Sequence, residues 1–411
     1  MRRSLILATL AMATALAGCV VSETRPIAKV DAVQAKTQIA EAELLDVALH
    51  EFDPGIPAAI AEDTEALDKK RIYPEVRKAE SRLLATRLKS TLEASGQWGA
   101  VRVVPSSVRF VDVLVTGRIV ESTGMRLSLE ISAEDATGRN WITKKTYSGD
   151  ADLGTYKTDA SLRARDPFQN VYAQIANDLL QAREKLSAAQ RSELRQVARL
   201  QFARDLAPQQ FSGYLTKGAD DLTHLARLPA ADDPAVARID KIRERDAALI
   251  DTIDGYNAGF SEKLFDSYGG FRRTSRDAIE REEKVRSQAR TRTVLGAAAV
   301  LAGIFASANC SATDYACQRL ESAARTAAAV GGVAAVMSGI KKYSDAKVAA
   351  QEVKELATSF QNEATPQVVE IEGRTLKLTG TAEERYREWR KLLAGIYQEE
   401  NSGTAAAATS P

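Results

Sequence analysis

Five residues stand out for the chemistry that their side chains can do: Cys19, Cys310, Cys317, His50 and His224. A thiol can be acylated, joined in a disulfide or bound to a metal, and a histidine can act as a general base near neutral pH. Neither histidine lies in a serine-histidine triad or metalloprotease motif, and no phosphate-binding glycine loop joins a strand to a helix. We therefore expect no catalytic residues and no cofactor, and both histidines to be structural or surface residues.

Residues 1–18 have the layout of a secretory signal peptide. A basic head precedes an apolar run from Leu5 to Leu16, which is too short to span a bilayer. The next residues, Leu16-Ala17-Gly18-Cys19, resemble the lipobox of bacterial lipoproteins, which implies that Cys19 is acylated and becomes the new N-terminus. Val20 stands where lipoproteins kept in the inner membrane often have Asp, so the resemblance implies an outer-membrane, mainly periplasmic address. The alternative is an ordinary secreted protein cleaved at small residues.

Two cysteines remain once Cys19 carries lipid. Cys310 and Cys317 are an even pair with a short loop between them, and in an oxidising compartment such a pair predicts one disulfide. A metal site is the alternative, but two thiolates without a nearby histidine make a poor zinc site. We therefore expect a disulfide and no metal.

The charges are balanced and exclude one class of partner. The chain has 56 Lys and Arg against 55 Asp and Glu, and loss of Arg2 and Arg3 with the leader leaves 54 against 55. Every arginine-rich stretch contains interleaved acids, whereas binding to phosphates needs a basic face. We expect no nucleic-acid partner.

The spacing of apolar residues predicts an α/β domain over residues 40–188 in the order β-α-β-β-β-α. The first strand alternates through Leu45, Val47 and Leu49. The first helix starts at Pro74 and ends at Gly96, where a left-handed cap suits glycine. The later strands are expected at 101–104, 110–120, 125–132 and 141–147, and the second helix is expected to start at Asp166-Pro167.

A lipid anchor, a tether over residues 19–39 and this order of elements resemble the curli-secretion-type lipoproteins and their periplasmic relatives. Phe110–Ile119 is similar to the central strand of that group, and Asp166-Pro167-Phe168 with Ile175-Ala176-Asn177-Asp178 is similar to its closing helix. The resemblance covers about residues 40–185 and implies ring assembly or binding to another envelope protein. The chain departs from the group in having no pair of long alternating membrane strands, which puts a secretion pore in doubt.

Beyond the α/β domain the sequence predicts mainly helices, so the fold class is α+β. A helical domain over 189–292 contains His224 in a polar helical stretch, then a long helix opened by Asp233-Pro234 and broken at Gly269-Gly270. Residues 346–400 are expected to form a helix, a β-hairpin around Glu372-Gly373-Arg374 and a last helix opened by a capping box of Thr381 and Glu384. The tail over 401–411 is expected to be disordered.

The composition of residues 293–345 predicts a helical hairpin rich in alanine and glycine, with the expected disulfide at its tip. Small residues recur every four positions, which lets two helices approach closely. They are Ala299, Gly303 and Ser307 on one helix, and Ala327, Gly331, Ala335 and Gly339 on the other. The hairpin is either buried in the helical domain, or it inserts partly into a bilayer or drives oligomerisation, because about 15 helical residues rise only near 22 Å.

Three hypotheses for the function follow. The first is a lipid-anchored envelope scaffold or assembly protein that acts through contacts with an envelope protein, with copies of itself as the other candidate partner. The second is a membrane-inserting or oligomerising protein that acts through residues 294–340. The third is an enzyme on cell-wall substrates, for which a deep pocket lined by two carboxylates would be the structural sign.

Overall fold

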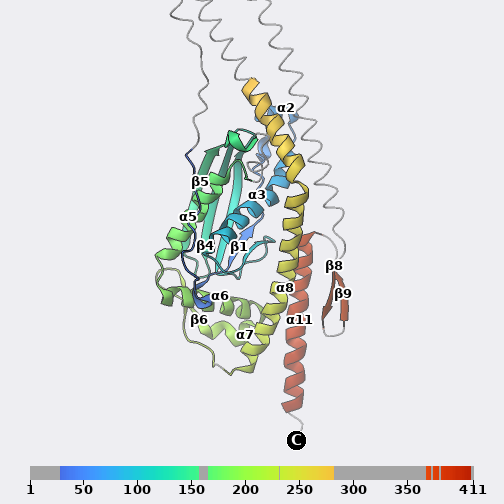
Figure 1. Ribbon diagram of the computed structural model, residues 1–411. Coiled ribbons are helices and arrows are strands. Elements are labelled where there is room, and N and C mark those ends of the chain that lie inside the picture. The colour runs from blue at the N-terminus through green and yellow to red at the C-terminus, as the bar shows by residue number, and fades with distance from the viewer. Residues whose placement is uncertain are drawn as a thin grey trace, which may run out of the picture.

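The computed structural model describes residues 28–156, 165–230, 232–281, 367–371, 374–378 and 381–408. The fold is mixed α+β, as the sequence predicts: a five-stranded mixed sheet with helices is followed by a mainly helical region (Figure 1). The predicted hairpin over 293–345 lies outside the described residues. Within the described ranges, no helix combines the length and the apolar composition that crossing a membrane requires.

The sheet has parallel pairs at one edge and antiparallel pairs at the other. Its strands are β1 (Val47–His50), β2 (Val101–Val104), β3 (Val113–Ser122), β4 (Arg126–Asp135) and β5 (Asn140–Asp150). Their spatial order is β2-β1-β3-β4-β5, with β1 parallel to both β2 and β3. The three strands that follow one another, β3 to β5, pair antiparallel, as short turns permit.

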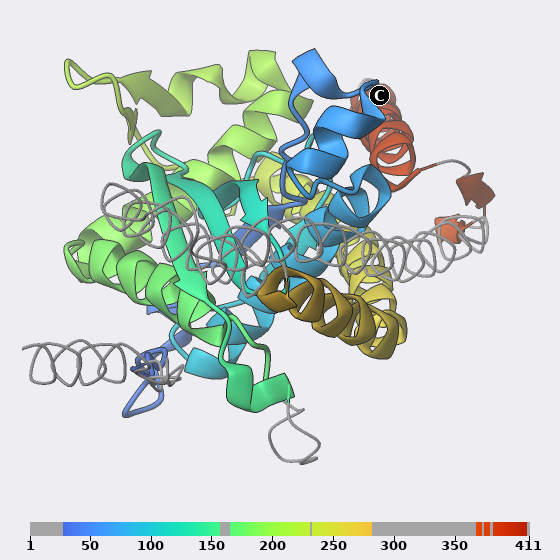
Figure 2. The ribbon, with the colours of Figure 1, turned by 90° about the horizontal axis from the view of Figure 1, so that it is seen from above.

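Two helices pack on the sheet and on each other, α3 (Pro74–Ser95) and α5 (Gln169–Glu184). The Leu84, Leu88 and Leu92 side chains of α3 are completely buried, because four-residue spacing places them on one helix face. Gly96 caps α3 in the left-handed conformation with φ of 64°, as expected from the sequence. Views from the side and from above place α5 and the C-terminal helix α11 (Ala382–Ala408) on opposite sides of the molecule (Figures 1 and 2).

The long helix α8 (Pro234–Lys263) covers the β2 edge of the sheet. The Asp254 carboxylate accepts the Val103 N–H at 2.8 Å and also pairs with Lys89, and the Asn257 side chain donates to the Val103 carbonyl at 3.2 Å. These two side chains satisfy backbone groups that a neighbouring strand would otherwise bind. The edge of β2 is therefore closed.

Residues 28–39, which we call the N-terminal segment, belong to the predicted tether of residues 19–39, yet part of this segment is held along α5. Asn170 accepts the Val30 N–H at 3.0 Å and donates to the Ala28 carbonyl at 2.9 Å. Two helical turns later, Asn177 accepts the Val33 N–H at 2.8 Å and donates to the Asp31 carbonyl at 3.0 Å. A side-chain amide offers both a donor and an acceptor, so each asparagine can bind an extended backbone as a strand would.

The predicted break at Gly269-Gly270 is wrong, because helical backbone continues over 265–281 after a turn at Leu264. Tyr268 and Phe271 flank the two glycines and are buried in a second apolar cluster with α3. Their burial outweighs the cost of about 1 kcal/mol for each glycine in a helix. The Arg272 guanidinium lies over the Phe168 ring at 4.3 Å from its centre, so this helix contacts the start of α5.

From residue 367 the C-terminal elements agree with the sequence up to the tail, whereas the helix predicted before the hairpin lies outside the described residues. β8 (Gln367–Ile371) and β9 (Arg374–Leu378) form the predicted hairpin. The Thr381 N–H donates to Glu384 at 2.8 Å and the Glu384 N–H donates to Thr381 at 3.2 Å, which confirms the capping box. α11 packs on α8 and continues to Ala408 through residues expected to be disordered, because alanine has the highest helix propensity.

Helix α6 (Ala188–Leu206) also belongs to the second region and starts at a capping box formed by Ser187 and Gln190. The short elements are η1 (Glu41–Glu43), η2 (Ala58–Ile60), α2 (Thr64–Lys69), η3 (Leu153–Tyr156), α7 (Pro208–Phe211), η4 (Ser212–Tyr214), β6 (Leu215–Lys217) and β7 (Thr223–Leu225).

The closed β2 edge predicts unequal effects of two substitutions on α8. Asp254→Ala leaves the buried Val103 N–H and Lys89 without their carboxylate, and we expect it to lower the free energy of unfolding by roughly 2–4 kcal/mol. Asp251→Ala, one turn earlier, removes only a half-exposed pair with Arg102 and should cost less than about 1 kcal/mol. Urea unfolding of both variants is the measurement. Equal losses would contradict the proposed closure of this edge.

Candidate functional site

The residues for which the sequence predicts covalent chemistry lie outside the described residues. Cys19, Cys310 and Cys317 are among them, and so are the seven small residues of the predicted hairpin, from Ala299 to Gly339. Acylation, the disulfide and the packing of the hairpin therefore stay predictions.

The two histidines lie in different sheets and do not form a joint site. The His50 Nε2–H donates to the Val108 carbonyl at 3.0 Å, and burial lowers the pKa of His50, so the ring is neutral at neutral pH. His224 lies on β7, so its predicted helical setting is wrong. A hydrogen bond with Asp220 raises the pKa of His224 on this exposed hairpin. Among the described residues, no cluster of three or more metal-binding side chains occurs.

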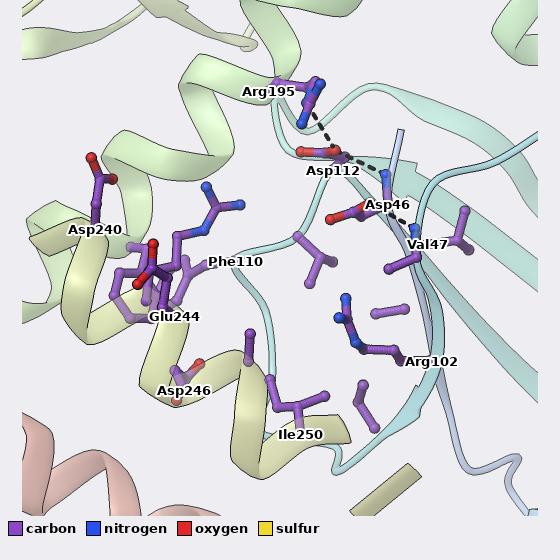
Figure 3. Close-up of a pocket in the computed structure, with 17 residues that line it drawn as sticks. Asp46, Val47, Arg102, Phe110, Asp112, Arg195, Asp240, Glu244, Asp246 and Ile250 are labelled. Atoms are coloured by element: carbon purple, nitrogen blue, oxygen red, sulfur yellow. Dashed lines mark hydrogen bonds and ion pairs between the residues drawn. The ribbon is translucent and has the colours of Figure 1, made fainter. Parts of the chain in front are cut away.

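A cavity of about 440 Å³ lies between the parallel strands and α8 (Figure 3). Its strand side is formed by the beginnings of β1 and β2 and by the residues just before β3. Its other walls come from α6 and α8. In Figure 3, the labelled Asp46, Asp112 and Arg102 lie on the strand side of the cavity, and Asp240, Glu244 and Asp246 lie on α8.

Two aspartates build the strand side of this cavity. The Asp112 carboxylate accepts the Asp46 N–H at 2.9 Å, and the Asp46 carboxylate accepts the Ala100 N–H at 2.8 Å. The Asp46 carbonyl accepts the Val113 N–H at 3.1 Å. The starts of β1, β2 and β3 are thus joined through the residues that precede them.

Asp112 is a buried carboxyl group with few hydrogen bonds. It is 2% exposed, and its Oδ1 atom has no hydrogen-bond partner among the described residues. The Arg195 Nε atom is 3.9 Å from Oδ2, which is too long for a hydrogen bond. Burial raises the pKa of Asp112 to about 6, and nearby Arg243 and Arg195 oppose this rise.

Asp246 is a second buried carboxyl group of the cavity wall, on α8. Burial raises its pKa to about 6 as well, against the opposing charge of Arg390. Its Oδ2 atom accepts the Tyr386 hydroxyl at 3.1 Å, and its Oδ1 atom is 3.9 Å from the Arg390 guanidinium. Asp246 therefore also ties α8 to α11.

Two carboxyl groups with a raised pKa line this cavity. Two carboxylates in a pocket are the feature expected for the third hypothesis, an enzyme on cell-wall substrates. Such groups can take up or release a proton near neutral pH, as a general acid or base does. Each of them, however, uses one oxygen in a hydrogen bond that holds the fold together. The arrangement supports binding of a polar ligand directly, whereas catalysis stays a hypothesis.

The sequence contained little that could single out this site. Asp112 lies within the stretch compared with a family strand, and Asp246 lies on the apolar side of a helix otherwise rich in exposed charges. An aspartate just before an apolar strand is the only local signal, and it is a common one at turns. The partners of both carboxyl groups come from distant parts of the chain.

No protein-family model matches this chain, and no curated protein or solved structure is significantly similar to it. The resemblance to curli-secretion-type lipoproteins thus rests on the motifs quoted above and stays a prediction.

The raised pKa of Asp112 predicts how stability changes with pH. Its ordinary pKa of 3.8 applies to the unfolded chain, so the folded protein holds the proton more tightly, and stability falls as pH rises from about 4 to about 6. Asp112→Asn cannot ionise and keeps an acceptor for the Asp46 N–H. Between these pH values the variant should lose less stability than the wild type, by up to about 3 kcal/mol.

Urea unfolding at several pH values measures this difference. Asp246 titrates in both proteins and cancels from the comparison. A difference between variant and wild type that does not change with pH would show that folding does not shift the pKa of Asp112.

Proposed function

We propose that this chain is a lipid-anchored envelope scaffold, held at the outer membrane through Cys19 and acting through contacts with a partner protein. The observation that carries the proposal is a difference between the two edges of the sheet. The β2 edge is closed by side chains of α8, whereas β5 pairs only with β4 in the part of the chain that the structure describes. An open strand edge is a common docking site for another protein.

The β5 edge has features that disfavour indiscriminate pairing. Lys144 has a φ of 41°, and its N–H donates to the Ser132 side chain at 3.0 Å instead of continuing the ladder. The register between β4 and β5 shifts at this point. An irregular, basic edge resists pairing with copies of itself, so a partner would have to match its shape and charge. This supports a specific partner over aggregation.

The N-terminal segment supports a short connection between the anchor and the α/β domain. Cys19 precedes Ala28 by nine positions, and fully extended chain spans at most about 3.6 Å per residue. Ala28 is bound at the start of α5, so a lipidated Cys19 would keep this end of the domain within roughly 30 Å of its acyl chains. A partner would then meet the domain close to the membrane.

Site-specific photo-cross-linking in intact cells tests the docking edge. A benzophenone amino acid at Thr143 or Thr146, both exposed on β5, should give one shared adduct with an envelope protein. The same probe at Glu65 on α2 or Gln209 on α7 is the matched exposed control and should not give it. Adducts that are equally strong at the control positions, or absent from β5, would exclude this edge.

The second hypothesis, action through residues 294–340, is favoured by one observation. The helix over 265–281, which precedes this stretch, contacts the start of α5 through Arg272 and Phe168, and Ala28 is bound to Asn170 one turn away. The chain thus leads toward Cys19 and toward residues 294–340 from the same end of the α/β domain. Both stretches could reach one membrane surface without crossing the domain.

Fractionation of cells separates this hypothesis from the first. The Cys19→Ser variant is exported behind a cleavable signal peptide that carries no lipobox, with and without residues 294–340. If these residues insert, the longer protein should stay with the membranes and the deletion should become soluble, while circular dichroism verifies that the deletion is folded. A longer protein that is already soluble would leave lipid at Cys19 as the sole anchor.

A further inference from the structure

The cavity between the parallel strands and α8 contains polar groups that the fold does not use. Most of its charged residues bind elsewhere: Arg102 pairs with Asp251, Asp240 pairs with Arg199, and Asp246 bonds to Tyr386. Asp112 is the exception on the strand side, because its buried Oδ1 atom has no hydrogen-bond partner within the described ranges.

On the α8 side, Arg243 and the exposed Glu244 both lack a hydrogen-bond or ion-pair partner among the described residues, and Arg243 is the more enclosed of the two. It is half-buried in the cavity wall, and no hydrogen bond or ion pair engages it among the described residues. Its charge lowers the pKa of both Asp112 and Asp246, so it lies within electrostatic range of each. No ion pair joins Arg243 to either carboxyl group. An acidic group and a basic group thus remain on different walls of one cavity.

The volume of the cavity limits the size of a ligand that could contact both Asp112 and Arg243. The cavity volume of about 440 Å³ lies toward the small end of pockets that hold small molecules. Its remaining wall is apolar, with Val47, Val104 and Ile250 among the lining side chains. An isolated cation or an isolated anion would satisfy only one of Asp112 and Arg243. A ligand that carries both charges on a short frame satisfies both.

We propose that this cavity binds a small zwitterion, a free amino acid or a dipeptide, with its ammonium group at Asp112 and its carboxylate at Arg243. A guanidinium binds a carboxylate through two parallel hydrogen bonds, which gives the second contact its specificity. Asp46, adjacent to Asp112, adds a further carboxylate to the ammonium end. This binding site is separate from the β5 edge and does not depend on the lipid anchor.

Calorimetric titration of the full-length protein with L-alanyl-L-alanine tests the proposal. The N-acetylated dipeptide lacks the ammonium group, and the dipeptide amide lacks the carboxylate. Near neutral pH, each analogue should bind at least about tenfold more weakly than the dipeptide, because each leaves one charged group of the cavity unpaired. Free alanine and leucine extend the panel to single amino acids.

Two variants assign the ends of the ligand. Arg243→Gln should remove the preference for a free carboxylate, and Asp112→Asn should remove the preference for a free ammonium group. Lys241→Gln alters an exposed residue of α8 that does not line the cavity and serves as the control. Arg243 is only half-buried, so its variant remains informative if Asp112→Asn fails to fold.

The pH dependence of dipeptide binding distinguishes a role of Asp112 in binding from a purely structural role. The charged groups that face Asp112 are Asp46 before β1, Arg195 on α6 and Arg243 on α8. An ammonium ligand favours the ionised carboxyl group, so affinity for the dipeptide should fall by several-fold between about pH 7 and pH 5, and not in Asp112→Asn. Absence of binding by the whole panel, or binding indifferent to both analogues, would overturn the proposal.

Discussion

The sheet depends on a constraint at its parallel edge, where three strands must start in register although their sequences lie far apart. Asp46 and Asp112 meet this constraint with side-chain hydrogen bonds that join the residues just before the paired strands. The arrangement removes the Asp112 carboxyl group from bulk water, and this burial raises its pKa. The same carboxyl group lines the cavity, so a side chain that fixes strand register also forms part of the cavity wall.

Helix α8 connects this edge of the sheet to the rest of the molecule. Its Asp254 and Asn257 side chains close the β2 edge, and its Asp246 side chain bonds to α11. Helical backbone then continues over 265–281 to the start of α5. One helix therefore connects the sheet edge, the cavity and the end of the domain where the N-terminal segment begins. Among the described residues, α6, α8 and α11 share one apolar core with the sheet.

Features that depend on local sequence were predictable. The alternation in β1, the glycine cap at Gly96 and the capping box at Thr381 are each set by residues a few positions apart. Strand β3 begins at Val113, three residues later than expected, because Phe110 and Val111 line the cavity beside α6 and α8. Helix α5 begins at Gln169, with Asp166 capping the turn before it.

Features that depend on distant partners were not predictable. Residues 28–39 read as a tether because the asparagines that bind them lie about 140 positions later in the sequence. The helix through Gly269 and Gly270 depends on burial against α3. Asp112 and Asp246 resemble ordinary surface aspartates until the elements around them assemble. Nothing in the sequence indicated that the residues lining the cavity lie close together in the fold.

The attachment of the N-terminal segment to α5 has a mechanical consequence. The contacts of Asn170 and Asn177 follow one another along the direction in which the segment runs. A tension applied at Ala28 along the axis of α5 would load both sets of hydrogen bonds in shear, so that they share the force. Tension across the axis would instead peel the segment away one asparagine at a time. The α/β domain would resist drag parallel to α5 far better than drag from the side.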